Sequence, residues 1–443
     1  MLATAATAAG PSGVVTEFFE RVHTSPPVQF AEPNSALRRW HELIVRSQAP
    51  AKCERLCQCV HIRGGFFSNM HHIASCVMEA ALQGCALIDE DTTTTARISN
   101  YLTSAAFRQR CKDRHSGALH GNANGLHCYF RPLSNCTRQL AGVKPGARLP
   151  NVFLLGPSQR APSQALLARV QSRTGLTSEL LALSAATAWV MRPSPDLEEA
   201  VRLYGEMVGA GGASAGHPLR CVGMHMRSPE KQGYAKLAEE VWRIQAPNFR
   251  FMGQRVAQIV GAQRVWLMSD SYNATLEVSY GTTQPSAAVL ERSEAELFRI
   301  VPAPLSCSPG HRAGALANTG SHGFTAATFA LGAVAAKAQR TATHESAGDD
   351  RVCGPEWLQD DGLMLIAGVI LLANCMAFVG SMGSNVGNAV VELMATLNFP
   401  PAQYDILNDV HPGLTWSELP WHAGIGPRRK ESEERLATRG GGP

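Results

Sequence analysis

The feature that most constrains the fold is the alternation of short apolar segments with helical segments after residue 218. Leu219–Met226 (LRCVGMHM), Arg264–Met268 (RVWLM) and Ala377–Gly380 (AFVG) each have the length and apolar content of a strand. Helical patterns stand between the first two, near 237–245 and 252–260. Because strands joined through helices lie parallel in one sheet, this half of the chain predicts an α/β domain.

The chain of 443 residues is long enough for two or three domains. A flexible joint, GAGGASAGHP over 209–218, is the candidate boundary between them. The segment 302–350 is rich in Ala, Gly, Ser, Thr and His, and we interpret it as a disordered insertion or as unspliced sequence. The expected parts are an N-terminal arm with one helix over 1–50, an α/β domain over 51–215, a Rossmann-like domain over 216–420 that contains the insertion, and a disordered tail over 421–443.

Charge and hydropathy argue against two classes of protein. The net charge is only +4, and no dense run of Lys and Arg carries interleaved aromatic residues, so nucleic-acid binding is not indicated. The apolar stretch Leu363–Val379 approaches the length of a membrane span. However, Asn374 lies inside it and no basic residues flank it, so we favour a buried helix over Leu363–Cys375 that runs into a buried strand.

Twelve cysteines are many for a cytosolic protein. Cys57 and Cys59 are too close together for a zinc site and lack a matching second half. We therefore expect an oxidising compartment, with disulfides in the N-terminal half of the chain. The glycosylation sequons at Asn135 and Asn273 allow a secretory location.

Two strand ends carry residues that suit an anionic ligand. His225 and Arg227 lie on one face at the carboxyl end of the first strand, where open α/β sheets bind ligands. In the segment 377–394, a strand meets a Gly/Ser/Asn turn and then a helix, so free backbone N–H groups can hold a phosphate. The alternatives are a solvated loop after the first strand and a tight turn that Ser384 caps. If the two loops face each other, the ligand is a nucleotide or a nucleotide sugar.

A further glycine turn, RGGFFSNMHH over 63–72, leads into a helix predicted over Met70–Gly84, and a short strand follows at Cys85–Ile88. His71 and His72 are neighbours on this helix and point in different directions, so they do not suit one metal ion. The simplest interpretation places them at a domain surface or at the edge of the core.

Four separated segments resemble the core α1,6-fucosyltransferases, which add fucose to the innermost N-acetylglucosamine of N-glycans. The segments are GGFFSNMHHIASCVMEAALQGCALI, CYFRPLSNCT, CVGMHMRSPEKQ and AFVGSMGSNVGNAVVELM, and they stand in the family's order. Weaker matches, WVMRPSPDLEEAV and YDILNDVH, join them. The resemblance covers residues 50–415 apart from the insertion.

The resemblance implies a GT-B-like pair of Rossmann-type α/β domains with parallel sheets, GDP-fucose as the donor, inversion at the sugar, and neither metal nor other cofactor. It assigns guanosine to His225, the diphosphate to Arg227, and further phosphate or sugar oxygens to Lys231. Ser384 would hold a phosphate oxygen, with Asn385 beside it. An arginine that neutralises the departing GDP is a reasonable substitute for a metal.

The resemblance also implies that Gly65 and Phe66 form a lid loop over the donor. In the family a second arginine follows the first, and here Ser228 stands in its place. The family's catalytic base falls at Ala235, and its guanosine-binding aspartate falls at Gly368. The candidate catalytic residues of this chain are therefore Arg227, Glu230, Lys231, Glu239 and Glu240, with one of the last two as a displaced base.

Disulfide pairs follow from the same resemblance. Cys53 is expected to pair with Cys136. Cys76 is expected to pair with Cys57 or Cys59.

The leading hypothesis is a fucosyltransferase of the Golgi or secretory lumen that transfers fucose to an N-glycan core in α1,6 linkage, although no membrane anchor is visible in the chain. One alternative is a non-catalytic glycan- or nucleotide-binding relative, which Ser228 and Ala235 motivate. Another is an inverting glycosyltransferase with a different donor or acceptor. The expected partners are a nucleotide sugar and an N-glycan or glycoprotein, not nucleic acid, and a homodimer is a further option.

Overall fold

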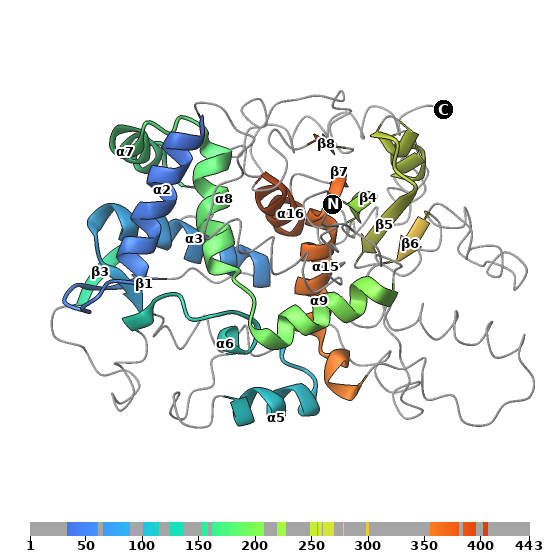
Figure 1. Cartoon of the computed structure of the whole chain (residues 1–443), viewed down its shortest axis with the longest axis horizontal. Helices are drawn as coiled ribbons and strands as arrows, with labels where there is room; N and C mark the ends of the chain where they lie inside the picture. The colour runs from blue at the N-terminus through green and yellow to red at the C-terminus, as the bar shows by residue number, and fades with distance from the viewer. Residues whose placement is uncertain are drawn as a thin grey trace, which may run out of the picture.

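The computed structural model shows two parallel sheets, with helices packed around and between them (Figure 1). The prediction of an α/β chain with parallel sheets is confirmed. The residues that the structure describes are 33–60, 65–88, 101–114, 125–136, 152–157, 162–207, 219–226, 249–254, 256–258, 260–269, 278, 298–300, 355–380, 384–395 and 402–405.

The first sheet has three strands in the order β2-β1-β3. Its strands are β1 (Leu56–Val60), β2 (Ala86–Ile88) and β3 (Val152–Pro157), and both neighbouring pairs are parallel. The helices of this half of the molecule are α2 (Pro33–Gln48), α3 (Phe66–Gln83), α5 (Ala105–Arg114), α6 (Leu126–Tyr129), α7 (Gln164–Thr174), α8 (Glu179–Val190) and α9 (Pro195–Met207).

Helix α3 is the central helix of this half, and nearly all of its residues are buried. It begins at Phe66, four residues before the predicted start at Met70. Gly84 ends it in the left-handed conformation, with φ 66°, and donates its N–H to the carbonyls of Ala80 and Ala81. Glycine adopts this conformation without steric cost, so the chain can turn directly into β2. The predicted order of helix, glycine and strand is confirmed.

The second sheet has five strands in the order β6-β5-β4-β7-β8, and all neighbouring pairs are parallel. Numbered along the chain within this sheet, the order is 3-2-1-4-5, which is typical of doubly wound α/β sheets. Its strands are β4 (Leu219–Met226), β5 (Arg264–Ser269), β6 (Phe298–Ile300), β7 (Cys375–Gly380) and β8 (Ala402–Asp405). The 3₁₀ helix η7 (Glu356–Gln359), α15 (Asp361–Ala373) and α16 (Asn385–Ala395) belong to this half.

The long apolar stretch is a helix followed by a strand, as predicted. Helix α15 ends at Ala373, and β7 begins at Cys375. The helix is apolar on all sides because it packs against β4, α9 and α16 and is buried from Gly362 to Ala373. Among the residues that the structure describes, none of the helices has both the length and the apolar character needed to cross a bilayer.

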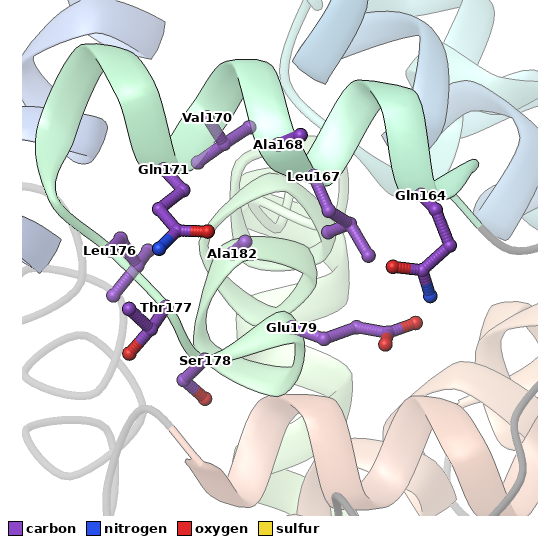
Figure 2. A pocket seen from close by; sticks show the side chains of 10 residues that line it. All are labelled: Gln164, Leu167, Ala168, Val170, Gln171, Leu176, Thr177, Ser178, Glu179 and Ala182. Carbon is purple, nitrogen blue, oxygen red and sulfur yellow. The ribbon is translucent and has the colours of Figure 1, made fainter.

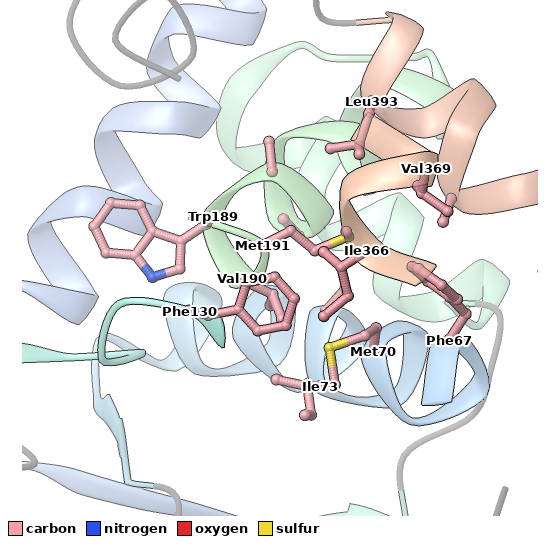
Figure 3. Packing of buried hydrophobic residues seen from close by; sticks show 14 of the residues in the cluster. Phe67, Met70, Ile73, Phe130, Trp189, Val190, Met191, Ile366, Val369 and Leu393 are labelled. Carbon is pink, nitrogen blue, oxygen red and sulfur yellow. The ribbon is translucent and has the colours of Figure 1, made fainter. Parts of the chain in front are cut away.

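One large hydrophobic cluster joins the helices of both halves (Figure 3). Met70 of α3, Val190 and Met191 at the end of α8, and Ile366 of α15 contribute to it, and Leu393 extends it along α16. A second cluster covers the opposite face of the five-stranded sheet, where Phe249 packs with residues of β4, β5 and β7. The five-stranded sheet is therefore buried on both faces. The proposed joint at 209–218 lies outside the described residues.

Five disulfides connect the described cysteines. They are Cys53–Cys136, Cys57–Cys85, Cys59–Cys76, Cys111–Cys128 and Cys221–Cys375. The implied Cys53–Cys136 pair is confirmed, and of the two partners left open for Cys76 the correct one is Cys59. The bridge between Cys221 and Cys375 lies in the second sheet, outside the N-terminal half where disulfides were expected. Several disulfides are compatible with a secreted or lumenal protein.

Candidate functional site

The two predicted strand ends lie side by side. β4 and β7 are neighbouring parallel strands, and His225 is in register with Gly380, the last residue of β7. On its other side β4 neighbours β5, where Met226 is in register with Ser269. The order of strands reverses between β4 and β7, and in open α/β sheets ligands bind outside the carboxyl ends of the strands at this reversal. The sequence at this edge is therefore in the position where doubly wound sheets bind ligands.

His225 lies near the end of β4 on the face that α15 covers. The same face carries Gly223, where an added Cβ would lie 2.9 Å from the carbonyl oxygen of Leu372 in α15. His225 is only 1% exposed, so its ring lies beneath the layer of helices. Its assignment to guanosine stays a prediction.

Ser384 and Asn385 begin helix α16 at the same edge of the sheet. Ser384 is 1% exposed, and its carbonyl accepts a hydrogen bond of 2.9 Å from the N–H of Asn388, so it stands at the start of the helix. The first N–H groups of a helix have no partner within the helix and carry a partial positive charge. The predicted strand and helix are confirmed, and the predicted turn between them, 381–383, lies outside the described residues.

Gly65 and Phe66 form the start of helix α3. Gly65 occupies the N-cap position, and Phe66 is 2% exposed. The Phe66 ring packs edge-to-face on Tyr101, with centroids 5.2 Å apart, and on Phe67 at 5.3 Å. Phe66 is therefore held in an aromatic cluster in this structure, and its function as a lid stays a prediction.

The start of helix α15 contains two neighbouring carboxyl groups that the sequence analysis did not single out. Asp360 is 0% exposed and accepts hydrogen bonds from the Leu363 N–H at 3.0 Å, the Ser104 N–H at 3.1 Å and the Tyr129 hydroxyl at 2.8 Å. Burial raises the pKa of Asp360 to about 6, against the opposing effect of these hydrogen bonds. Burial, and then the charge of Asp360, raise the pKa of Asp361 to about 7.

The start of α15, which carries this carboxyl pair, is joined to the first half of the molecule by the hydrogen bond from Tyr129 to Asp360. Phe66 of α3 lies beside it, with its ring centroid 6.0 Å from that of Tyr129.

The remaining predicted site residues lie outside the described residues, so their assigned functions stay predictions. They are Arg227, Ser228, Glu230, Lys231, Ala235, Glu239 and Glu240.

His71 and His72 lie in the core, so the expectation that they would be at a surface or core edge is wrong. They are 0% and 1% exposed. Helix α3 packs between the first sheet and helices α8 and α16, which leaves none of its faces to solvent in this turn. His71 Nε2 lies 3.0 Å from Glu392 Oε1 of α16. The one sequence signal was Glu392 itself, the only charged residue of α16, but it does not identify His71 as its partner.

One group of side chains in the described part of the chain has the spacing of metal ligands. The ligand atoms of Cys111, His127 and Cys128 all lie within 4.8 Å of one another. However, Cys111 and Cys128 form a disulfide with each other. Because cysteine binds metals as the thiolate, the bridged pair does not offer metal ligands in this form.

A small pocket lies between helices α7 and α8 (Figure 2). It has a volume of about 170 Å³, and its polar lining residues are Gln164, Gln171, Thr177, Ser178 and Glu179. No residue of the predicted donor site lines it, so it is separate from the strand edge.

Two comparisons of the sequence with known proteins give no match. A scan against models of protein families finds no match, and a search of curated proteins finds no relative.

Proposed function

We propose that this protein is a glycosyltransferase of GT-B-like architecture that uses GDP-fucose, related to the core α1,6-fucosyltransferases. The observation that supports it best is the register of His225 with Gly380. It brings together, at the point where the strand order reverses, the two segments that resemble the family's donor-binding motifs.

The expected chemistry follows from the groups at this edge. A diphosphate at the start of α16 would accept hydrogen bonds from the free N–H groups near Ser384 and Asn385 and would interact favourably with the helix dipole. Arg227 is the residue after β4, and its planar fork suits two phosphate oxygens at once. Both groups would stabilise the negative charge that develops on GDP as the bond to the sugar breaks.

The transfer itself needs one base. The hydroxyl oxygen of the acceptor attacks the anomeric carbon of fucose from the face opposite GDP, and the bond from that carbon to the phosphate oxygen breaks. The hydroxyl proton passes to the base, for which Glu239 and Glu240 are the candidates. GDP leaves with the electron pair, and the configuration at the sugar is inverted.

Two disulfides support the resemblance independently of the donor site. The pairing of Cys53 with Cys136, and of Cys76 with one of the two cysteines of β1, was implied by the family and is present in the structure. The disulfides also agree with the lumenal compartment in which N-glycans are modified.

A non-catalytic relative that binds a nucleotide or glycan is the second candidate. Ser228 and Ala235, which replace a family arginine and the family base, favour it. A different donor or acceptor is the third, because the α1,6 linkage rests on the resemblance alone.

The proposal is tested by calorimetry of GDP binding. Arg227→Lys keeps the charge and loses the fork, and we expect GDP to bind about tenfold more weakly or worse. Arg227→Ala should weaken binding further, and Ser384→Ala should have a smaller effect than either. Unchanged GDP affinity in Arg227→Ala would show that the donor does not bind at this strand end and would contradict the proposal.

Catalysis is tested separately from binding. Release of GDP from GDP-fucose in the presence of N-glycan acceptors would identify a transferase. If Glu239 or Glu240 is the catalytic base, its substitution by Gln should abolish fucose transfer and leave GDP affinity intact. A wild-type protein that binds GDP and never turns over would favour the non-catalytic relative, and turnover only with another sugar nucleotide would favour the third candidate.

A further inference from the structure

A fully buried polar contact joins three helices that are far apart in the sequence. Oε1 of Glu392, in α16, lies 3.0 Å from Nε2 of His71, in α3. Oε2 of Glu392 accepts a hydrogen bond of 2.5 Å from the hydroxyl of Thr187, in α8. Glu392 and His71 are 0% exposed, and Thr187 is 1% exposed. Neither half of the molecule could form this contact alone, because α16 belongs to the second half.

Packing alone does not require a carboxyl group at this position. Val390, Val391, Leu393 and Met394, which flank Glu392 in α16, are all 0% exposed. Removing a carboxylate from water is unfavourable, and an apolar side chain of similar volume often gives equal or greater stability. A buried polar group is satisfied in only one geometry, whereas apolar surfaces can slide and rotate against each other. Glu392 therefore fixes the rotation and the axial position of α16 against α3 and α8.

Of the two helices that Glu392 and His71 connect, α16 begins at the proposed donor site, and the resemblance assigns the start of α3 to the lid over that site. Ser384 precedes Glu392 by about two helical turns, and Phe66 precedes His71 by about one and a half turns. We propose that Glu392, His71 and Thr187 are positioning residues that hold the start of α16, and with it the phosphate-binding N–H groups, in fixed geometry relative to the start of α3. This inference rests on the proposed function.

The first variant to measure is Glu392→Ala, which removes both contacts. We expect GDP affinity to fall about tenfold or more, because the N–H groups at the start of α16 lose their fixed position. Glu392→Gln retains the length of the side chain, a carbonyl to accept from Thr187, and a polar amide group facing His71. We expect it to keep GDP affinity within about threefold of the wild type, so that the conservative variant rescues the loss.

Two further variants separate positioning from general stability. Thr187→Val replaces the hydroxyl by a methyl group and removes the hydrogen bond to Glu392, and we expect about threefold weaker GDP binding. Gln48→Ala is the matched control, because Gln48 is also 0% exposed and bridges two elements, accepting from the Leu87 N–H at 2.9 Å and donating to the Cys85 carbonyl at 3.2 Å. It should lower the melting temperature and leave GDP affinity unchanged, since it joins α2 to β2 and not to α16.

The outcomes distinguish failure of the positioning role from failure of the proposed function. A wild-type protein that does not bind GDP would overturn the proposed function, and the positioning role with it. Binding by the wild type with unchanged affinity in folded Glu392→Ala would overturn the positioning role alone. If Glu392→Ala does not fold, Thr187→Val decides, because unchanged affinity there would equally overturn the role. If Gln48→Ala lowers GDP affinity as much as Glu392→Ala does, GDP affinity follows overall stability, and the positioning role is overturned.

Discussion

The two sheets of this protein are supported in different ways. In the three-stranded sheet, the face under α3 carries the buried residues Cys57, Cys59 and Leu155. On the other face, Leu56, Gln58 and Val152 of β1 and β3 are only half-buried. In the five-stranded sheet, buried residues of β4, β5 and β7 alternate between two hydrophobic clusters, one on each face. Parallel sheets are usually covered on both faces, and in β1 and β3 the second face of the first sheet is covered less completely than either face of the five-stranded sheet.

The disulfides follow this difference. Four of the five lie between Cys53 and Cys136, in the half that contains the three-stranded sheet, and the five-stranded sheet contains one. A small core buries too little apolar surface to offset the entropy of ordering its chain, and covalent links reduce that entropy in the unfolded state. The smaller sheet thus has several disulfides in addition to its apolar packing, whereas the larger sheet relies mainly on apolar packing.

The largest expected effect comes from removing a disulfide of the first sheet. Cys53–Cys136 closes a loop with a sequence separation of 83, which corresponds to about 4–5 kcal/mol in the chain-entropy model. We expect Cys53→Ser/Cys136→Ser to lower the melting temperature strongly and to expose the amides of β1 and β2 to hydrogen exchange.

The matched control is Cys221→Ser/Cys375→Ser, whose bridge spans a separation of 154. The chain-entropy model predicts a similar loss of global stability for it. Hydrogen exchange should differ between the two variants, because the amides of β4 and β7 remain enclosed on both faces of their sheet. If the amides of β4 and β7 lose as much protection in this variant as those of β1 and β2 lose in the first, the comparison is contradicted.

A smaller effect tests the tight packing of the second sheet. A methyl group at Gly223 would lie 2.9 Å from the carbonyl oxygen of Leu372 and 3.2 Å from its Cβ, so β4 and α15 would have to separate. We expect Gly223→Ala to cost about 1–3 kcal/mol in urea unfolding. At Gly65 the nearest atom to an added Cβ is the Tyr101 hydroxyl, at 3.9 Å, so Gly65→Ala is the control and should be nearly neutral. Similar losses in both variants would argue against close packing as the cause.

The five-stranded sheet could be predicted from sequence more completely than the three-stranded sheet. β4 and α15 are long apolar segments with clear ends, and their type and approximate bounds were predictable because local pattern and burial agree. β1 is five residues, LCQCV, and β3 contains the exposed Phe153, so neither has the pattern of a buried strand. In the smaller sheet, the resemblance and the cysteines were more informative than hydrophobic periodicity.

The candidate site was predictable only in part. The two strand ends could be placed together because strands of a parallel sheet all end at one edge. The contact of His71 with Glu392 could not, because it joins residues in different halves of the chain and no local pattern encodes it. The hydrogen bond from Tyr129 to Asp360 spans 231 residues for the same reason.

The start of α15 is where the two halves meet, and it gives the smallest expected effect. Asp360 bonds to Tyr129 and Ser104 of the first half, and Asp361 lies beside it. The pKa of Asp361 is raised from 3.8 to about 7, so the folded state favours its neutral form. A cost in stability therefore appears as the pH rises above about 4 and is complete above about 7. Because the side chain is partly exposed, we expect only about 1 kcal/mol.

Asp361→Asn removes this charge and should make the protein more stable than the wild type at pH 8, with no difference at pH 4. Thermal unfolding across this range measures the gain. Asp360→Asn is the control, because Asp360 accepts from Leu363, Ser104 and Tyr129, and one amide carbonyl cannot replace both carboxylate oxygens. That variant should be less stable at both pH values, since the helix loses its cap and the two halves lose a shared contact. If Asp361→Asn is destabilising at pH 8, the carboxylate stabilises the start of α15 through the helix dipole more than its burial costs.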